Sequence, residues 1–312
     1  MTKILVAVAW PYASGPRHIG HAVSTFIPAD IFARYHRMKG DDVLMVGGSD
    51  MHGTPTTVRA EEEGVPPQAV ADRFHALHAK NIEQLGVAYD LYWSTADENH
   101  KRDAQEIFLR LREKGYIDER TMTSPYCPAG SHFLPDRYVE GECPRCHFPN
   151  ARGDQCEECG HLLDPFELIG PRCRVHKVPP EPRETKHAFF RLSAFQEPLK
   201  KWVADKGYWR LPVITFTKAW LGEGLLDRPV TRDIDWGSEV PLPGDEWRSK
   251  RMYVWFEAVM GYLTASREFW RRSGQPEKWK EWWHDPAAKH YYFAGKDNIV
   301  FHTIIWPAIL MG

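Results

Sequence analysis

The sequence lacks any hydrophobic run of membrane-spanning length. No segment approaches the roughly 18 to 20 consecutive apolar residues that are needed to cross a bilayer. The first residues, Met1-Thr-Lys-Ile, lead directly into a short apolar run and do not have the layout of a secretory signal. The pattern therefore argues against a membrane partner and favours the cytoplasm as the compartment.

The sequence also lacks an excess of either charge. Its 312 residues include 40 Lys and Arg against 42 Asp and Glu, which gives a net charge of −2. A nearly neutral chain has no overall attraction for nucleic acid, so any contact with RNA requires a local basic patch. Apolar residues make up 43% and charged residues 26%, which is typical of a globular protein with space for two domains.

Cysteines are few, yet four of the six fall into two close pairs. Cys143-Pro-Arg-Cys146 is followed, after nine residues, by Cys156-Glu-Glu-Cys159. Each tight turn aims two thiolates at one point, and four thiolates complete the tetrahedron that Zn²⁺ prefers. The alternatives are a redox-active pair and a degenerate metal site. Residues 125–177 around these pairs show neither helix nor strand periodicity, which predicts a small module stabilised by metal in a reducing compartment.

A second, weaker set of ligands lies outside the first. Cys127 precedes it, and Cys173-Arg-Val-His176 follows it. These three residues form a possible second metal site. The set offers three ligands, one fewer than tetrahedral Zn²⁺ takes, unless the nearby His132 takes part.

The amino-terminal stretch combines a buried strand with a loop that suits a phosphate. The apolar run Ile4–Trp10 predicts the strand, and a turn that contains Gly15 then opens a helix. A helix start presents free backbone N–H groups and a positive dipole end. His18 and His21 share one face and can donate to one phosphate, while Gly20 leaves space for a flat base. The alternative is that both histidines are ordinary surface residues.

Two later turns carry acidic residues at the ends of predicted strands. Asp50 follows the apolar strand Val43–Val46, and Gly295 and Asp297 follow a strand that begins near His290. The carboxyl ends of parallel strands are where open α/β sheets bind ligands. Asp50 can hold an ammonium group, or it can cap a helix or a turn. Asp297 can hold ribose hydroxyls.

Taken together, these motifs resemble those of class I aminoacyl-tRNA synthetases, and most closely the methionyl-tRNA synthetase family. The resemblance rests on His18-Ile-Gly-His21 after a Pro-Tyr-Ala-x-Gly turn, on Asp50-Met-His-Gly-Thr-Pro55, and on the stretch 133–141. It extends over nearly all of the chain. It implies an α/β fold with a Rossmann-type parallel sheet, interrupted by a connective insertion that carries a zinc knuckle. Residues 1–118 and 233–312 would form the two halves of the sheet domain, the second apparently incomplete, and residues 119–232 would form the insertion.

The resemblance also implies an activity. The chain would activate L-methionine with ATP and Mg²⁺ and transfer it to tRNA(Met) as a methionine–tRNA ligase. The implied ATP-binding residues are Gly15, His18, Gly20, His21, Gly295 and Asp297. The implied methionine-binding residues are Ala9, Trp10, Tyr12, Asp50, Trp255, Ala258, Tyr262 and His302.

The implied catalytic residues are His18 and His21, which would meet the α-phosphate, and Arg232, which would meet the pyrophosphate end of ATP. By itself, the pair Arg232-Asp233 is more often a surface ion pair of little energetic weight. One departure from the family is that Glu257-Ala-Val259 stands where Asp-Ala-Pro is usual.

Two further family features are missing from the sequence: the Lys-Met-Ser-Lys-Ser loop that completes the ATP site, and the helical anticodon-binding domain. We therefore expect the amino-terminal part of a longer synthetase. Two alternatives stay open: a shortened paralogue that activates an amino acid for an acceptor other than tRNA, and a catalytically silent, zinc-bearing interaction module.

Overall fold

A four-stranded parallel sheet forms the centre of the molecule. The structure is a computed structural model, and it describes residues 1–153, 156–159 and 163–312. The sheet has the order β13-β1-β2-β3. Its strands are β1 (Lys3–Val8), β2 (Asp42–Ser49), β3 (Leu91–Ser94) and β13 (Lys289–Phe293). The parallel α/β architecture predicted from the sequence is confirmed.

The strand order creates a topological switch point beside β1. The chain proceeds outward from β1 to β2 and β3, and β13 then pairs with the opposite edge of β1, with Val8 beside Phe293. Loops that leave β1 and β13 therefore diverge at neighbouring strand ends. Open α/β sheets bind their ligands in the crevice that forms at such a point.

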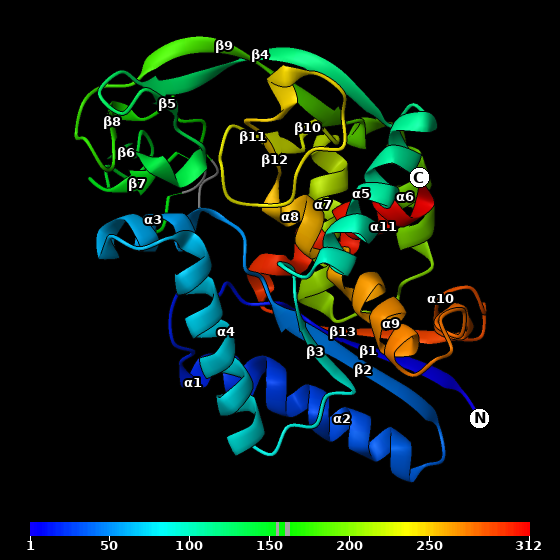
Figure 1. Ribbon diagram of the computed structural model, residues 1–312. Coiled ribbons are helices and arrows are strands. Elements are labelled where there is room, and N and C mark those ends of the chain that lie inside the picture. Colours follow the sequence, from blue (N-terminus) through cyan, green and yellow to red (C-terminus); the bar gives the residue numbers. More distant parts are fainter. Residues whose placement is uncertain (154–155, 160–162) are drawn as a thin grey trace.

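Both faces of the sheet are covered by helices, which explains why β1 is apolar throughout. Ile4, Val6 and Val8 belong to one buried cluster, which includes side chains of α2 (Ile27–Met38) and α4 (Pro67–Gln84). Leu5 and Ala7 belong to the other cluster, with side chains of α5 (Glu98–Glu113) and α9 (Gly261–Arg272). Figure 1 shows α2 below the sheet, α4 at its left, and α5 and α9 above it.

A long antiparallel pair of strands connects the sheet domain to a small module. β4 (Ile117–Cys127) pairs with β9 (Glu181–Phe190), from Ile117 opposite Phe190 to Tyr126 opposite Glu181. Figure 1 shows these two strands arching over the molecule to the module at the upper left. β10 (Arg228–Pro229) and β5 (His132–Phe133) extend the same sheet at its two edges.

The module contains its own three-stranded sheet. β6 (Val139–Glu142) lies between β7 (Ala151–Arg152) and β8 (Ile169–Cys173). Its buried cluster is small, and Cys127, Cys143, Cys156 and Cys173 are part of it, beside a few apolar side chains such as Leu134. The cysteines thus stand at the centre of the module, as the lack of apolar periodicity in residues 125–177 predicted.

Two sequence patterns in the second half of the chain predict something other than what the structure shows. The turn-rich stretch 225–237 predicts a return into the main sheet, and the amphipathic pattern from Phe195 to Trp209 predicts a single helix. Instead, β10 joins β9, and β11 (Thr231–Arg232) pairs with β12 (Arg251–Met252), so this stretch belongs to the strands beside the long pair and not to the parallel sheet. The helix expected to extend from Phe195 to Trp209 ends earlier, as α6 (Gln196–Ala204), since Asp-Lys-Gly after it favours a turn.

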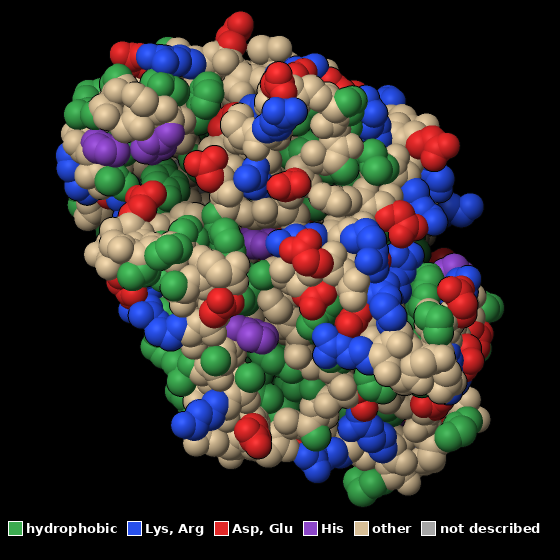
Figure 2. Space-filling model, in the orientation of Figure 1, with side chains coloured by type: hydrophobic (Ala, Val, Ile, Leu, Met, Phe, Trp, Pro, Cys, Tyr) green, Lys and Arg blue, Asp and Glu red, His purple; other side chains and the backbone are tan. Residues whose placement is uncertain are grey.

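The remaining elements complete the layers. Other helices are α1 (Ile19–His21), α3 (Thr54–Glu63), α7 (Leu211–Glu223), α8 (Val254–Ala258), α10 (Lys280–Trp283) and α11 (Trp306–Met311). Short 3₁₀ or π turns cover Ala22–Phe26, Asp136–Tyr138, Leu192–Phe195, Asp245–Trp247, Lys296–Asn298 and Phe301–Ile305. Within the described part of the chain, no helix has the length and apolar character that crossing a membrane requires. Acidic and basic side chains are mingled over the face seen in Figure 2.

Candidate adenylation site and metal-ligand clusters

The loops after β1 and β2 are joined by backbone hydrogen bonds. The Asp50 N–H donates to the Pro11 carbonyl at 2.9 Å, and the Ala13 N–H donates to the Asp50 carbonyl at 2.7 Å. Tyr12 and Asp50 thereby extend the parallel pairing beyond the ends of the strands. The loop with the two histidines and the loop with Asp50 therefore form one rigid edge at the switch point.

His18 and His21 lie together, as their spacing predicted, with ring centroids 4.1 Å apart. One detail of the prediction is wrong: the Gly20 N–H is not free, because it donates to His18 Nδ1 at 3.1 Å. This bond leaves the proton of a neutral His18 on Nε2, which is then the nitrogen that can donate to a ligand. A Cβ at Gly20 would lie 2.7 Å from His18 Cε1, so the glycine makes space for the histidine ring.

Arg17 stabilises this loop and was missed by sequence reasoning. Its Nη2 donates to the carbonyls of Tyr12 at 2.8 Å and of Gly15 at 2.9 Å. Burial lowers the pKa of His21, and the charges of Arg17 and His18 lower it further, so His21 is neutral at pH 7. The only signal in the sequence was a single basic residue directly before the histidine motif.

Asp50 is a carboxylate in the protein interior, with 2% of its surface exposed. Burial, and next the negative charge of Glu257, raise the pKa of Asp50 well above its usual value. The backbone N–H of His52 donates to Asp50 Oδ1 at 3.2 Å, and this hydrogen bond lowers the pKa of Asp50. A cation bound beside Asp50 would offset both the burial and the repulsion.

Glu257 forms a buried polar cluster below Asp50. Its carboxylate contacts His52 Nδ1 at 3.0 Å and His100 Nε2 at 3.3 Å, and it accepts a 2.5 Å hydrogen bond from Ser238 Oγ. Burial acts to raise the pKa of Glu257, but the charge of His52 and the contact with His100 outweigh it and hold the pKa well below the usual range. The sequence showed Glu257 only as a departure from the family, with no sign of these partners.

Aromatic residues predicted to bind methionine meet in two pairs. The rings of Tyr12 and Trp255 meet edge to face at 5.7 Å. His302 Nδ1 donates to the Asn298 carbonyl at 2.8 Å, so its Nε2 accepts a 2.7 Å hydrogen bond from the Tyr262 hydroxyl. This hydrogen bond fixes the orientation of both rings.

The other predicted lining residues are buried or half-buried around these pairs. The Trp10 ring packs on Gly261, where a Cβ would lie 2.9 Å from it. The Ala9 N–H donates to the Phe293 carbonyl at 2.9 Å and joins the ends of β1 and β13. Ala258 is buried at the end of α8.

Gly295 and Asp297 lie directly after β13, as predicted. Gly295 precedes the short turn Lys296–Asn298, in which Asp297 is exposed. Because β13 pairs with β1, this turn begins at the strand end next to the loop that carries His18 and His21. The two predicted halves of an ATP site therefore flank the switch point.

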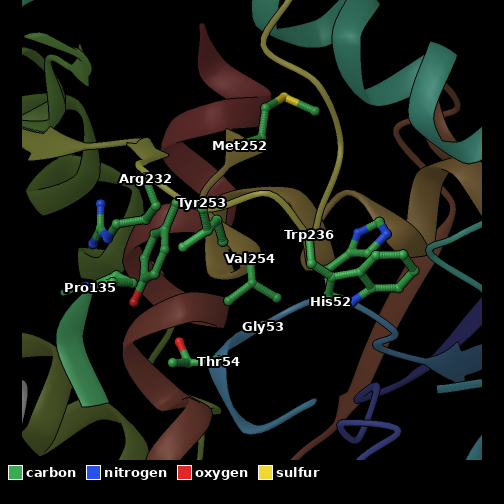
Figure 3. A pocket seen from close by; sticks show the side chains of 10 residues that line it. His52, Gly53, Thr54, Pro135, Arg232, Trp236, Met252, Tyr253 and Val254 are labelled. Atoms are coloured by element: carbon green, nitrogen blue, oxygen red, sulfur yellow. The ribbon is translucent and has the colours of Figure 1, made fainter. Parts of the chain in front are cut away.

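Arg232 lines a pocket with His52, Thr54 and Tyr253 (Figure 3). Its guanidinium lies 3.9 Å from the centre of the Tyr253 ring and donates to the carbonyls of Pro229 and Thr231. Trp236 closes another side, with its ring edge to face with His52 at 5.3 Å. Arg232 is therefore positioned by many contacts. Its predicted role toward pyrophosphate stays a prediction.

The four paired cysteines converge on one point. Ligand atoms of Cys143, Cys146, Cys156 and Cys159 all lie within 4.8 Å of one another. Cys143 Sγ is 3.9 Å from Cys159 Sγ, and Cys146 Sγ is 3.5 Å from Cys156 Sγ. Tetrahedral Zn²⁺ with Zn–S bonds of about 2.3 Å requires sulfurs about 3.8 Å apart. The donor set therefore fits zinc.

The outer set also converges. Cys127, Cys173 and His176 place one ligand atom each within 4.8 Å of the other two. This three-ligand cluster lies at the ends of β4 and β8, where the module meets the long strand pair.

Comparisons with known proteins agree with this geometry. Residues 4–312 match the family model described as tRNA synthetases class I (M). The chain belongs to this family. It is 56% identical, over 99% of its length, to a methionine–tRNA ligase of Dehalococcoides mccartyi, and it covers 56% of that protein. It is 50% identical, over 99% of its length, to a methionine–tRNA ligase of Thermoplasma acidophilum, and it again covers 56% of that protein.

A solved structure of the same class I family has a similar fold. The methionyl-tRNA synthetase of Mycobacterium tuberculosis in complex with methionyl-adenylate superposes with a TM-score of 0.73 at 27% identity. The comparison covers 100% of this chain and 54% of that one. The chain thus spans about half the length of the class I synthetases that it matches.

Proposed function

We propose that this chain carries the site at which L-methionine reacts with ATP to form methionyl-adenylate, the first step of tRNA(Met) charging. The main support is Asp50, a buried carboxylate held by backbone hydrogen bonds against the loop that bears His18 and His21. This arrangement presents an ammonium site and phosphate donors on one rigid edge. The chain's relatives named methionine–tRNA ligase further support the proposal.

In this proposal, the ammonium group of methionine binds Asp50. Its positive charge stabilises the ionised Asp50 carboxylate, which burial otherwise disfavours. The side chain then extends along Ala9, Trp10, Tyr12, Trp255, Ala258, Tyr262 and His302. A flexible thioether gains favourable sulfur–aromatic contacts in such a lining. The hydrogen bond between Tyr262 and His302 keeps two of these walls in place.

ATP would occupy the crevice between the ends of β1 and β13. Gly295 and Asp297 would hold the ribose, Gly15 and Gly20 would line the loop, and His18 and His21 would donate to the α-phosphate. A carboxylate oxygen of methionine forms a bond to the α-phosphorus while the bond from that phosphorus to the bridging oxygen breaks and pyrophosphate leaves. The carboxylate is already ionised, so no general base is required.

The neutral His21 and the Nε2–H of His18 suit this step because they add hydrogen-bond donors where negative charge develops. Arg232 would take up charge at the pyrophosphate end. Mg²⁺ bound with ATP would supply further positive charge. The four-cysteine cluster would hold one structural Zn²⁺, whose contribution is to fold the insertion and not to take part in the reaction.

We also retain the division into residues 1–118, 119–232 and 233–312, in which the insertion separates two halves of one sheet domain. Its support is that β1, β2 and β3 precede the long strand pair while β13, their sheet partner, follows it. The use of cysteine as a metal ligand fits a reducing compartment such as the cytoplasm.

The test is binding of L-methionine and of an unhydrolysable methionyl-adenylate analogue by the 312-residue chain, together with methionine-dependent exchange of pyrophosphate into ATP. We expect saturable binding of both ligands, and loss of methionine binding in Asp50→Asn. Asp245→Asn, at a side chain that is 89% exposed, is the matched control. Failure of the unmodified chain to bind either ligand would overturn the proposal.

Exchange without charging of tRNA(Met) would limit the activity of these 312 residues to adenylate formation, and it would leave open the alternative of an acceptor other than tRNA. Binding of the analogue without exchange would place the remaining catalytic groups outside these 312 residues. Each result therefore separates the steps of the proposed reaction.

A further inference from the structure

A buried histidine of α4 contacts the loop that carries His18 and His21. His78 has no exposed surface, and its Nε2 lies between Arg17 Nε at 3.0 Å and the Gly15 carbonyl oxygen at 2.8 Å. In one neutral tautomer Nε2 accepts from the arginine, and in the other it donates to the carbonyl. Burial lowers the pKa of His78 to about 4, so the ring is uncharged at pH 7 in either case.

The positive charge of Arg17 has no carboxylate partner. Its guanidinium nitrogens contact ring nitrogens and backbone carbonyls, and it forms no ion pair with any residue that the structure describes. Arg59 contacts the same loop and offers a contrast. Its Nη1 donates to the Ser14 carbonyl at 3.3 Å, while its Nε pairs with Glu63 at 2.7 Å. A half-buried cation without a counter-charge is costly, so Arg17 favours an anion nearby.

Two ionisable side chains next to this cluster are also uncharged at pH 7. His75 lies one turn before His78 on α4, and its ring stacks on Tyr92 of β3 with ring planes 10° apart. Burial lowers the pKa of His75 and raises the pKa of Tyr92 to about 12. Neither group therefore offsets the charge of the Arg17 guanidinium.

Arg17 also contacts the ring of His21. Its Nη1 lies 3.4 Å from His21 Nε2, and because an arginine N–H can only donate, that nitrogen accepts. The proton of the neutral His21 ring then lies on Nδ1, which is buried and has no hydrogen-bond partner among the described residues. Burial lowers the pKa of His21 most, and the charges of Arg17 and then His18 lower it further. Arg17 thus influences both the charge and the donor atom of His21.

We propose that Arg17 and His78 are positioning residues for His21. The uncharged His78 ring holds the Arg17 guanidinium behind His21 without neutralising it, as a carboxylate at that place would. The retained charge keeps His21 a neutral donor and adds positive potential where the ATP phosphates would bind. The part of this inference that concerns ATP rests on the proposed adenylation function.

The test compares two substitutions at position 78 that have the same shape and differ in charge. His78→Gln keeps a neutral acceptor and a donor beside Arg17, whereas His78→Glu places a carboxylate there. NMR titration of the His21 ring in the intact 312-residue chain is expected to give a pKa about one unit higher in His78→Glu than in His78→Gln. The His21 signal is assigned by its loss in His21→Gln.

Gln84→Glu is the matched control. It adds the same charge at the exposed carboxyl end of α4, where solvent screens it, so the His21 pKa is expected not to move.

ATP binding, measured by calorimetry, gives a second readout. We expect His78→Glu to bind ATP about tenfold more weakly than His78→Gln, because the positive potential behind the phosphates is cancelled. The affinity for methionine is expected to stay the same, since Asp50 is unaltered. A merely structural role of His78 would instead lower both affinities together and would count against the inference.

Arg17→Leu removes the charge itself. We expect the His21 pKa to rise as it does in His78→Glu, and nitrogen NMR shifts to show both neutral tautomers of His21 once the Arg17 donor is lost. Equal His21 pKa values in the Gln and Glu variants, or an unchanged value in Arg17→Leu, would overturn the inference. These titrations need no ligand, so they decide it separately from methionine binding, whose failure would overturn the adenylation proposal.

Discussion

The parallel sheet and the inserted module are stabilised by opposite means. In the sheet, consecutive residues of β1 from Ile4 to Val8 are at most 1% exposed and pack apolar side chains against helices on both faces. In the module, four buried cysteines stand in the core, and Glu140 binds three cationic side chains. A small unit buries too little apolar surface to fold by that means alone, so the ion pairs of Glu140 and the bonds to the proposed Zn²⁺ would take its place.

The most direct test of this difference is to remove the Zn²⁺ that we propose for the four-cysteine cluster. Chelation, or Cys143→Ser, is expected to unfold residues 139–173 while β1, β2 and β13 remain folded. Structural zinc sites contribute about 10–16 kcal/mol of apparent binding free energy, so loss of the ion exceeds what the small core can offset. Hydrogen exchange, followed peptide by peptide, measures the loss of protection in the module and in the sheet separately. Equal loss of protection in β1 would mean that the two regions fold as one unit.

A substitution at Asp50 tests the proposed ammonium site at the edge of the sheet without disturbing the module. In Asp50→Asn, methionine affinity is expected to fall by about 10²- to 10³-fold, because the ammonium loses its charged partner in a buried site. The same variant is expected to be about 1–2 kcal/mol more stable without ligand, since it removes a buried charge beside Glu257. Calorimetric titration and thermal unfolding measure the two effects. A loss of both affinity and stability would instead indicate a structural role.

Glu140 tests the ion pairs of the module. Its carboxylate contacts Arg152, Arg172 and Lys177 at 2.9 Å each, and although burial opposes them, these cations lower the pKa of Glu140 to about 2. We expect Glu140→Gln to destabilise the module by about 2–3 kcal/mol at pH 7. Glu142→Gln, at a more exposed glutamate of the same strand, is the control.

The pH dependence of this effect has a defined sign. The pKa of Glu140 is lower in the folded chain than in the unfolded chain. Its ion pairs therefore stabilise the folded module above about pH 4.5, and this stabilisation is lost as the pH falls toward 2. The stabilities of the Glu140→Gln variant and the unmodified chain should therefore converge in acid, as measured by denaturant unfolding monitored in the module. A difference that persists at pH 2 would contradict the ion-pair interpretation.

The smallest effect concerns the protonation of Asp50. Because burial and Glu257 raise its pKa, Asp50 is neutral below that raised value and binds an ammonium poorly. Methionine affinity is therefore expected to fall about tenfold for each pH unit below the raised pKa and to level off above it. Titration calorimetry over a pH series measures this, and Asp50→Asn should show no such slope.

Local patterns in the sequence were sufficient to predict those structural features that form within one segment of the chain. The apolar run Ile4–Trp10 predicted β1, because a strand buried on both faces must be apolar throughout. The Cys-x-x-Cys spacing predicted that the four inner cysteines converge, since a tight turn brings its own two sulfurs together. The proximity of His18 and His21 followed from their separation of three residues along the first helical turn.

Only the tertiary structure decided contacts between distant segments. His52 and Glu257 are 205 residues apart, and no local pattern shows that they meet below Asp50 or that Glu257 raises the pKa of Asp50. Residues 225–237 pair with β9 and β12 and not with the parallel sheet, and strand pairing is a contact between segments that are distant in the sequence. The sequence by itself determined the chemistry of the candidate groups for methionine, phosphate and zinc, because residue type and local spacing set that chemistry. Packing decided their charge, orientation and partners, because burial and long-range contacts exist only in the folded chain.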